Sequence, residues 1–119
     1  MTQQITYVII AGDSNYGDYT TFCKEMDHAL SKSTSVEMHI PQLYGSGAEK
    51  LAQLYSTERN YTFHLYPLQV NNKKTFQEII KAIKMAGGTR MGVMLFGSSE
   101  ATIQLVQVCE DLGIKCRTI

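Results

Sequence analysis

Short apolar runs rich in β-branched residues alternate with amphipathic segments along the chain, and this alternation constrains the fold more than any other feature. The apolar runs cover about residues 4–11, 36–40, 62–67, 91–96 and 115–119. In the segments between them, 19–30, 48–60, 75–86 and 100–112, apolar residues recur every three or four positions. Strand-helix alternation of this kind requires parallel pairing through right-handed crossovers. The sequence therefore predicts one α/β domain over residues 1–119, with three layers: a five-stranded, mainly parallel sheet and helices on both faces.

Local signals mark where these segments end. Asp18 is a good N-cap for the first helix, and Gly87-Gly88 marks the end of the third. Residues 68–74 are polar and predict a connection. His39 and His64 are out of phase with the apolar residues of their strands, so we expect them at exposed or edge positions and not as ligands.

Composition excludes several classes of function. The 119 residues carry 11 basic and 11 acidic side chains, and the longest basic run is Lys73-Lys74, which argues against nucleic acid as a partner. The three cysteines cannot all pair, and none lies at metal-ligand spacing from another or from a histidine. We expect reduced thiols, no metal and no cofactor. The N-terminal stretch has no basic region and is broken by Gly12-Asp13, which predicts a cytoplasmic protein without a signal peptide or a membrane span.

In an open parallel sheet, ligands bind outside the carboxyl ends of the strands. The loops that follow the first, second and fourth strands, at 12–18, 44–47 and 97–99, all combine glycine with small polar residues. Helix N-termini attract anions, and glycine lets a phosphate approach the backbone closely, so we expect Gly47 and Ser98 to lie against a ligand. Strand-to-helix turns also prefer glycine and serine for purely structural reasons. Neither GxGxxG nor GxxxxGK[ST] occurs, which disfavours a standard dinucleotide-binding domain and a P-loop NTPase.

Three motifs carry a family resemblance. The run VIIAGDSNYGDY is similar to the pattern GSRxFxDY, YGSGAEKLAQLYSTE to GGARGADxLAxxYAxE, and FGSSEATIQLVQVCEDLGIKCRTI to DGxSxGTxxxIxxAxxxGxPVxVI. In this order they resemble the SLOG superfamily, which is related to the DprA-like and LOG proteins, and in particular its small YpsA-like branch. The resemblance implies a Rossmann-like domain that binds a nucleotide or nucleotide-derived ligand.

Carried over by position, the resemblance implies ligand contacts in all three loops. They are Gly12, Asp13, Ser14 and Tyr16 in the first loop, Gly45, Ser46, Gly47 and Glu49 in the second, and Gly97, Ser98, Ser99, Glu100 and Thr102 in the third. The family's arginines in the first two motifs fall on Ser14 and Ser46. The loss of two phosphate partners implies a weaker site, a less charged ligand, or basic residues from a neighbouring subunit. For that reason we expect a homo-oligomer.

Three functions stay open at this stage. The first is capture or sensing of a nucleotide-derived ligand without turnover. SLOG domains are associated with nucleotide signals in prokaryotic immunity, so this function includes a sponge that sequesters such a signal. The sponge could be encoded by a bacterium or by a virus. The second is a nucleotide N-glycosidase or phosphoribohydrolase of the LOG type. Leu105 stands where the LOG motif has its glutamate, which leaves Glu49 and Glu100 as candidate substitutes. The third is a scaffold with a vestigial pocket.

Overall fold

The chain forms strands and helices in alternation. The computed structural model describes residues 5–41, 46–66, 72–88 and 90–119. The strands are β1 (Ile5–Gly12), β2 (Ser35–Pro41), β3 (Thr62–Tyr66), β4 (Arg90–Phe96) and β5 (Cys116–Thr118). The helices are α1 (Tyr19–Ala29), α2 (Ala48–Glu58), α3 (Asn72–Met85) and α4 (Glu100–Asp111).

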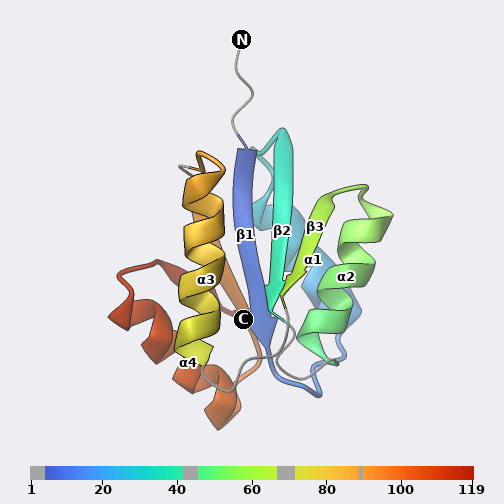
Figure 1. Cartoon of the computed structure of the whole chain (residues 1–119). Coiled ribbons are helices and arrows are strands. Elements are labelled where there is room, and N and C mark those ends of the chain that lie inside the picture. Colours follow the sequence, from blue (N-terminus) through green and yellow to red (C-terminus); the bar gives the residue numbers. More distant parts are fainter. Residues whose placement is uncertain (1–4, 42–45, 67–71, 89) are drawn as a thin grey trace.

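The strands form one five-stranded sheet in the order β3-β2-β1-β4-β5 (Figure 1). Every strand pair is parallel, so the predicted α/β class is confirmed and the sheet is parallel throughout. The chain first builds outward from β1 to β2 and β3. It then returns across the sheet through α3 to place β4 on the other side of β1. The result is a Rossmann-like fold.

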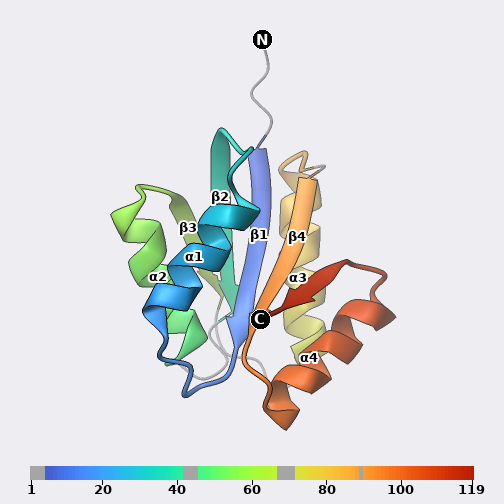
Figure 2. The ribbon, with the colours of Figure 1, turned by 180° about the vertical axis from the view of Figure 1, so that it is seen from behind.

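Both faces of the sheet are covered by helices. Val8 and Ile10 of β1 pack in one core with residues of α1 and α2, whereas Tyr7 and Ile9 pack in a second core with residues of α3 and α4. Successive side chains of a strand point to opposite faces, which is why neighbours in β1 belong to different cores. Figures 1 and 2 show α3 and α1 on these opposite faces.

The signals for helix ends hold at both α1 and α3. The Asp18 carboxylate accepts the Thr21 N–H at 3.0 Å, as an N-cap should. Gly87 has a φ of 84°, and the Gly88 N–H donates to the Ile83 carbonyl at 2.9 Å, which ends α3 where expected. The beginning of α3 is a correction: the helix starts at Asn72, inside the predicted 68–74 connection. Its first residues are polar, so they gave no apolar periodicity to detect.

His39 is a second correction. Its side chain is buried, with 4 % of its surface exposed, whereas His64 on the edge strand β3 is exposed as expected. The expectation for His39 assumed that the face opposite the apolar residues of β2 meets solvent. Because β2 lies inside a sheet with helices on both faces, that face is covered as well. Burial, together with the nearby His64, lowers the pKa of His39 to about 4, so the ring is neutral at neutral pH.

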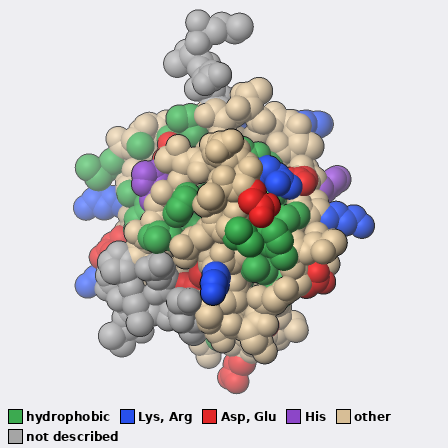
Figure 3. Space-filling model, turned by 90° about the vertical axis from the view of Figure 1, so that its right-hand side faces the viewer, with side chains coloured by type: hydrophobic (Ala, Val, Ile, Leu, Met, Phe, Trp, Pro, Cys, Tyr) green, Lys and Arg blue, Asp and Glu red, His purple; other side chains and the backbone are tan. Residues whose placement is uncertain are grey.

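The surface agrees with the balanced composition. On the side formed by α2 and β3, basic and acidic side chains are interspersed and form no continuous basic stripe (Figure 3). Cys23, Cys109 and Cys116 are free thiols. Within the described ranges, no helix has the length and apolar character needed to cross a bilayer.

Two isoleucines in neighbouring helices test the placement of the α3–α4 core. Ile79 of α3 is fully buried, whereas Ile103 of α4 has 61 % of its surface exposed. Ile79→Ala should lower the free energy of unfolding by about 2–5 kcal/mol because it leaves a cavity. Ile103→Ala should change it by no more than about 0.5 kcal/mol. Urea unfolding measures both values, and equal losses in the two variants would contradict this packing.

Candidate functional site

The strand order reverses between β1 and β4. β2 and β3 lie on one side of β1, and β4 and β5 lie on the other. The loops after β1 and β4 therefore flank the switch point, which is where ligands bind in sheets of this kind. Both loops are among the three singled out from the sequence. Of the loop after β2, Ser46 and Gly47 are described, and the predicted contact Gly45 lies outside the described residues.

Asp13 lies at the centre of this edge and joins three segments. Its carboxylate accepts the backbone N–H groups of Ser98 at 3.1 Å and Ser99 at 3.2 Å. It also accepts the Ser99 hydroxyl at 2.5 Å and the hydroxyl of Thr102. Through its backbone, Asp13 donates to the Phe96 carbonyl at 2.8 Å and accepts the Ala48 N–H at 3.2 Å. One residue thus links the end of β1 to the beginnings of both α2 and α4.

The hydrogen bonds keep the Asp13 carboxylate ionised. Partial burial alone would raise its pKa, but the hydrogen bonds from Ser99, Thr102 and Ser98 outweigh burial and lower the pKa below its ordinary value. The Ser98 and Ser99 N–H groups at the start of α4 are the donors that a phosphate would use. They already bind the protein's own carboxylate, and that negative charge repels a phosphate placed there. The sequence did not reveal that Asp13 occupies these donors, because Asp13 is 85 residues away from Ser98 and 86 from Ser99.

The glycines of the three loops allow the loops to pack on one another. A Cβ at Gly47, which has a φ of 65°, would lie 2.1 Å from the Asp13 carbonyl oxygen. A Cβ at Gly97 would lie 2.2 Å from the Asp13 carboxylate, and one at Gly12 would lie 2.2 Å from the Phe96 carbonyl oxygen. Glycine is therefore required at these positions by contacts within the protein, with or without a ligand. From the sequence, we expect glycine at position 47 because a ligand lies against it. In the structure, the Asp13 backbone lies against it.

The remaining small residues of the first two loops are also held in place. The Ser46 hydroxyl donates to the carbonyl of the exposed Ser14 at 3.0 Å. The ring of Tyr16 packs on Phe96, with 5.5 Å between the ring centroids. The sequence-predicted contacts of the first loop and the described part of the second therefore do lie together at one edge.

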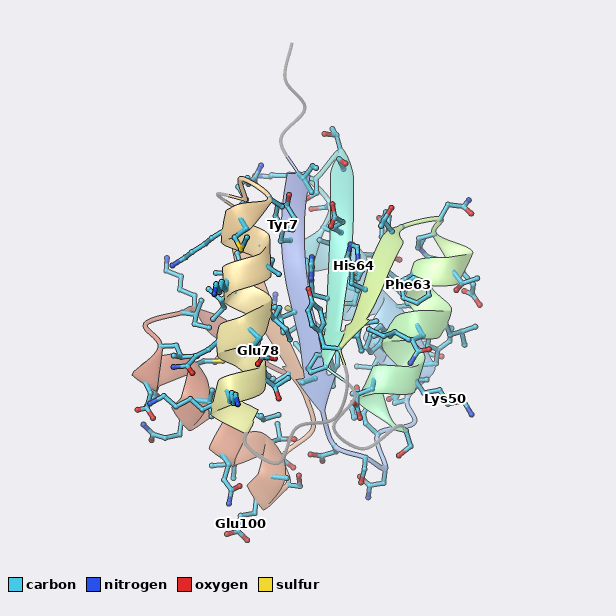
Figure 4. The ribbon with its side chains drawn as sticks, viewed as in Figure 1. Tyr7, Lys50, Phe63, His64, Glu78 and Glu100 are labelled. Carbon is cyan, nitrogen blue, oxygen red and sulfur yellow. The ribbon has the colours of Figure 1, made fainter. Side chains whose placement is uncertain are left out.

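The two candidate glutamates lie in different surroundings. Glu49, in the first turn of α2, is buried with 1 % of its surface exposed. Glu100, in the first turn of α4, is exposed, and its side chain extends away from the body of the protein (Figure 4). Leu105, at the place of the LOG glutamate, is fully buried in the core under α4.

Three of the helices that begin at this edge, α1, α2 and α4, differ in how they are capped. Asp18 caps α1 and Ser99 caps α4 through their side chains. The N-cap of α2 is Gly47, which makes no side-chain capping hydrogen bond. The first turn of a helix leaves backbone N–H groups without an intrahelical acceptor. At α2 the first-turn N–H of Ala48 is accepted instead by the Asp13 carbonyl, at 3.2 Å.

A separate groove lies away from this edge. It has a volume of about 250 Å³ and opens beside α1 over β4 and β5, with Val8, Leu30 and Met94 among its lining residues. Its lining is mainly apolar and includes two basic residues, Lys115 and Arg117, but none of the site residues predicted from the sequence.

Comparison with known proteins adds no relative: no family model matches the chain, and no curated protein matches it. The resemblance to the SLOG superfamily therefore rests on the three sequence motifs. The fold is compatible with that resemblance, and a fold alone does not decide a function.

Replacing the charge of Asp13 tests its role as a link between the loops. Asp13→Asn should lower the free energy of unfolding at pH 7 by about 1–3 kcal/mol, because an amide nitrogen would face backbone donors. Since the pKa of Asp13 is lowered in the folded state, its contribution is present above the unfolded pKa of about 3.9 and disappears as the pH falls below it. The gap between wild type and variant should therefore narrow below about pH 4 in urea unfolding. A stability difference between wild type and Asp13→Asn that stays constant down to about pH 2 to 3 would contradict this role. Asp111→Asn, at the exposed end of α4, is the control, and a loss of stability equal to that of Asp13→Asn would contradict the role as well.

Two glycines with nearly the same φ separate loop packing from backbone strain. Gly113 has a φ of 68°, and a Cβ there would have nothing within 4 Å, whereas Gly47 has a φ of 65° and contacts the Asp13 backbone. Gly113→Ala should cost about 1–2 kcal/mol, from the left-handed conformation alone. Gly47→Ala should cost clearly more, because the loops must also move apart. Thermal unfolding compares the two, and equal losses would show that the close approach at Gly47 is unimportant.

Proposed function

We propose that this chain binds a small nucleotide-derived ligand at the carboxyl edge of the sheet, between β1 and β4, and holds it without turnover. The observation that carries the proposal is the convergence of the loops after β1, β2 and β4 at the point where the strand order reverses. This is the general ligand position of open parallel sheets. The three motifs that resemble SLOG proteins fall on the same loops.

Charge at this edge favours a ligand with few phosphate groups. The Asp13 carboxylate lies at the start of α4, and serines occupy positions 14 and 46, where the resembled family has arginines. A polyphosphate would meet repulsion without a guanidinium to offset it. A nucleoside with a single or esterified phosphate suits the edge better.

Binding without chemistry is favoured over N-glycoside cleavage. The LOG-type reaction relies on a glutamate where this chain has the buried Leu105, and Glu100 extends away from the body of the protein. Neither residue places an acid or base beside a ligand bound between β1 and β4. Glu49, the other candidate substitute, is buried in the first turn of α2 with 1 % of its surface exposed.

A scaffold without a ligand is the second candidate, and it too has a specific observation in its favour. The Asp13 carboxylate is fully engaged by Ser98, Ser99 and Thr102, and the space beside Gly47 and Gly97 is filled by Asp13 itself. These contacts stabilise the loops whether or not a ligand binds.

Mass spectrometry of small molecules released from natively purified protein tests the proposal, together with incubation with nucleoside monophosphates, ADP-ribose derivatives and cyclic oligonucleotides. We expect one intact nucleotide-derived compound at near-stoichiometric amount. Ser98→Trp, which places a bulky side chain at the exposed mouth of the site, should reduce the recovered amount at least about tenfold. The matched control is Ser31→Trp, in an exposed turn that follows α1 and lies at the opposite edge of the sheet.

The other outcomes each identify a different function. Free base and ribose phosphate that accumulate with time would establish the glycosidase. No bound compound, and no thermal shift with any member of the panel, would establish the scaffold. Equal loss of ligand in Ser98→Trp and Ser31→Trp would place the site elsewhere.

A further inference from the structure

Two histidines and a glutamate gather on the α3 side of the sheet, away from the loops described above. Glu37 and His39 are two residues apart in β2, so their side chains point to the same face. His64 of β3 is directly opposite His39 in the parallel register. The His64 Nε2 lies 2.9 Å from the Glu37 Oε1, and the His39 Nε2 lies 3.5 Å from the same oxygen.

His39 presents a buried nitrogen that lacks a partner. Within the part of the chain that the structure describes, its Nε2 is buried and has no hydrogen-bond partner, and the Glu37 Oε1 lies 3.5 Å from it. The side chain as a whole is only 5 % exposed. An unsatisfied buried polar atom costs free energy unless something binds it. This nitrogen faces the Glu37 carboxylate and the His64 ring.

The other nitrogen of His39 is held by a tyrosine. Nδ1 lies 2.5 Å from the Tyr66 hydroxyl. When Nδ1 carries the proton and donates it to that oxygen, Nε2 keeps a free lone pair directed at the cluster. Metal-binding histidines are oriented in this way by a partner on the far nitrogen. The rings of Tyr7 and Tyr66 flank His39, at 5.7 and 5.6 Å between centroids, and restrict its movement.

We propose that Glu37, His39 and His64 bind a divalent first-row transition ion such as Zn²⁺. One oxygen and two nitrogens, all within 4.8 Å of one another, form the donor set. Ligand atoms bound to Zn²⁺ at about 2.0–2.1 Å lie about 3.4 Å apart in a tetrahedron, so small side-chain rotations suffice. Imidazole and carboxylate donors suit Zn²⁺, Ni²⁺, Co²⁺ and Cu²⁺ better than Ca²⁺ or Mg²⁺.

The exposure of the cluster lets an ion enter from solvent. The His64 side chain is 48 % exposed, and Figure 4 shows it on the open face of β3, opposite to the side on which Phe63 turns toward α2. Three protein ligands leave a fourth position for water. No single sequence motif signals this site: the separation of His64 from Glu37 is 27 residues, and only the pairing of β2 with β3 brings them together.

Titration of the metal-free protein with ZnCl₂ by isothermal calorimetry tests the site, and CoCl₂ gives the spectroscopic signature. We expect one ion per chain, a micromolar or tighter dissociation constant, and visible Co²⁺ absorption typical of a site with fewer than six ligands. His64→Gln, on an exposed edge strand where the fold should tolerate it, should weaken binding at least about tenfold, and so should Glu37→Gln. Tyr66→Phe retains all three ligand atoms and should weaken binding less and alter the Co²⁺ spectrum.

His28→Gln is the matched control, because His28 is an exposed histidine on α1, outside the cluster. It should bind Zn²⁺ as the wild type does. The proposal fails if the wild type binds no ion at micromolar concentration, or if binding survives both His64→Gln and Glu37→Gln. Because the titration needs no nucleotide, its result is independent of the function proposed for the carboxyl edge.

Discussion

The arrangement of the candidate site depends on one carboxylate. Asp13 follows directly after β1 and binds the first N–H groups of the α4 region, the hydroxyls of Ser99 and Thr102, and through its backbone the start of α2. Charge-assisted hydrogen bonds of this kind are stronger than neutral ones. They fix the loops after β1 and β4 relative to each other at the point where the sheet reverses its strand order. The edge is therefore preorganised before any ligand arrives.

The same interaction limits what the edge can bind. An internal anion occupies the N-terminus of α4, which in many parallel α/β proteins is left to a phosphate. The positions of the family's two arginines hold Ser14 and Ser46, and the Ser46 hydroxyl donates to the Ser14 carbonyl. Both features reduce the affinity for highly charged ligands. Under the proposed function, they favour a ligand with few phosphate groups over a polyphosphate.

The sequence predicted the fold well because local signals agreed with the global pattern. Apolar runs and helical periodicity located the strands and helices, and Asp18 and Gly87 marked helix ends as the structure shows them. Failures occurred where a residue's environment is set by distant parts of the chain. His39 is buried because side chains of the neighbouring strands, among them Tyr7 and Tyr66, pack around its ring. Asp13 is satisfied by residues more than eighty positions away. The first turn of α3 was missed because its polar residues carry no apolar period.

Chemical-shift mapping tests most directly whether a small ligand binds at the carboxyl edge. The backbone amides of ¹⁵N-labelled protein would be followed by NMR while the compound released from the native protein, or a nucleoside monophosphate if none is released, is added. We expect the largest shifts to fall on residues 13–16, 46–48 and 97–99, with little change at the amino ends of the strands. Shifts centred on the groove beside α1 and β5, or no shifts at saturating ligand, would contradict binding at this edge.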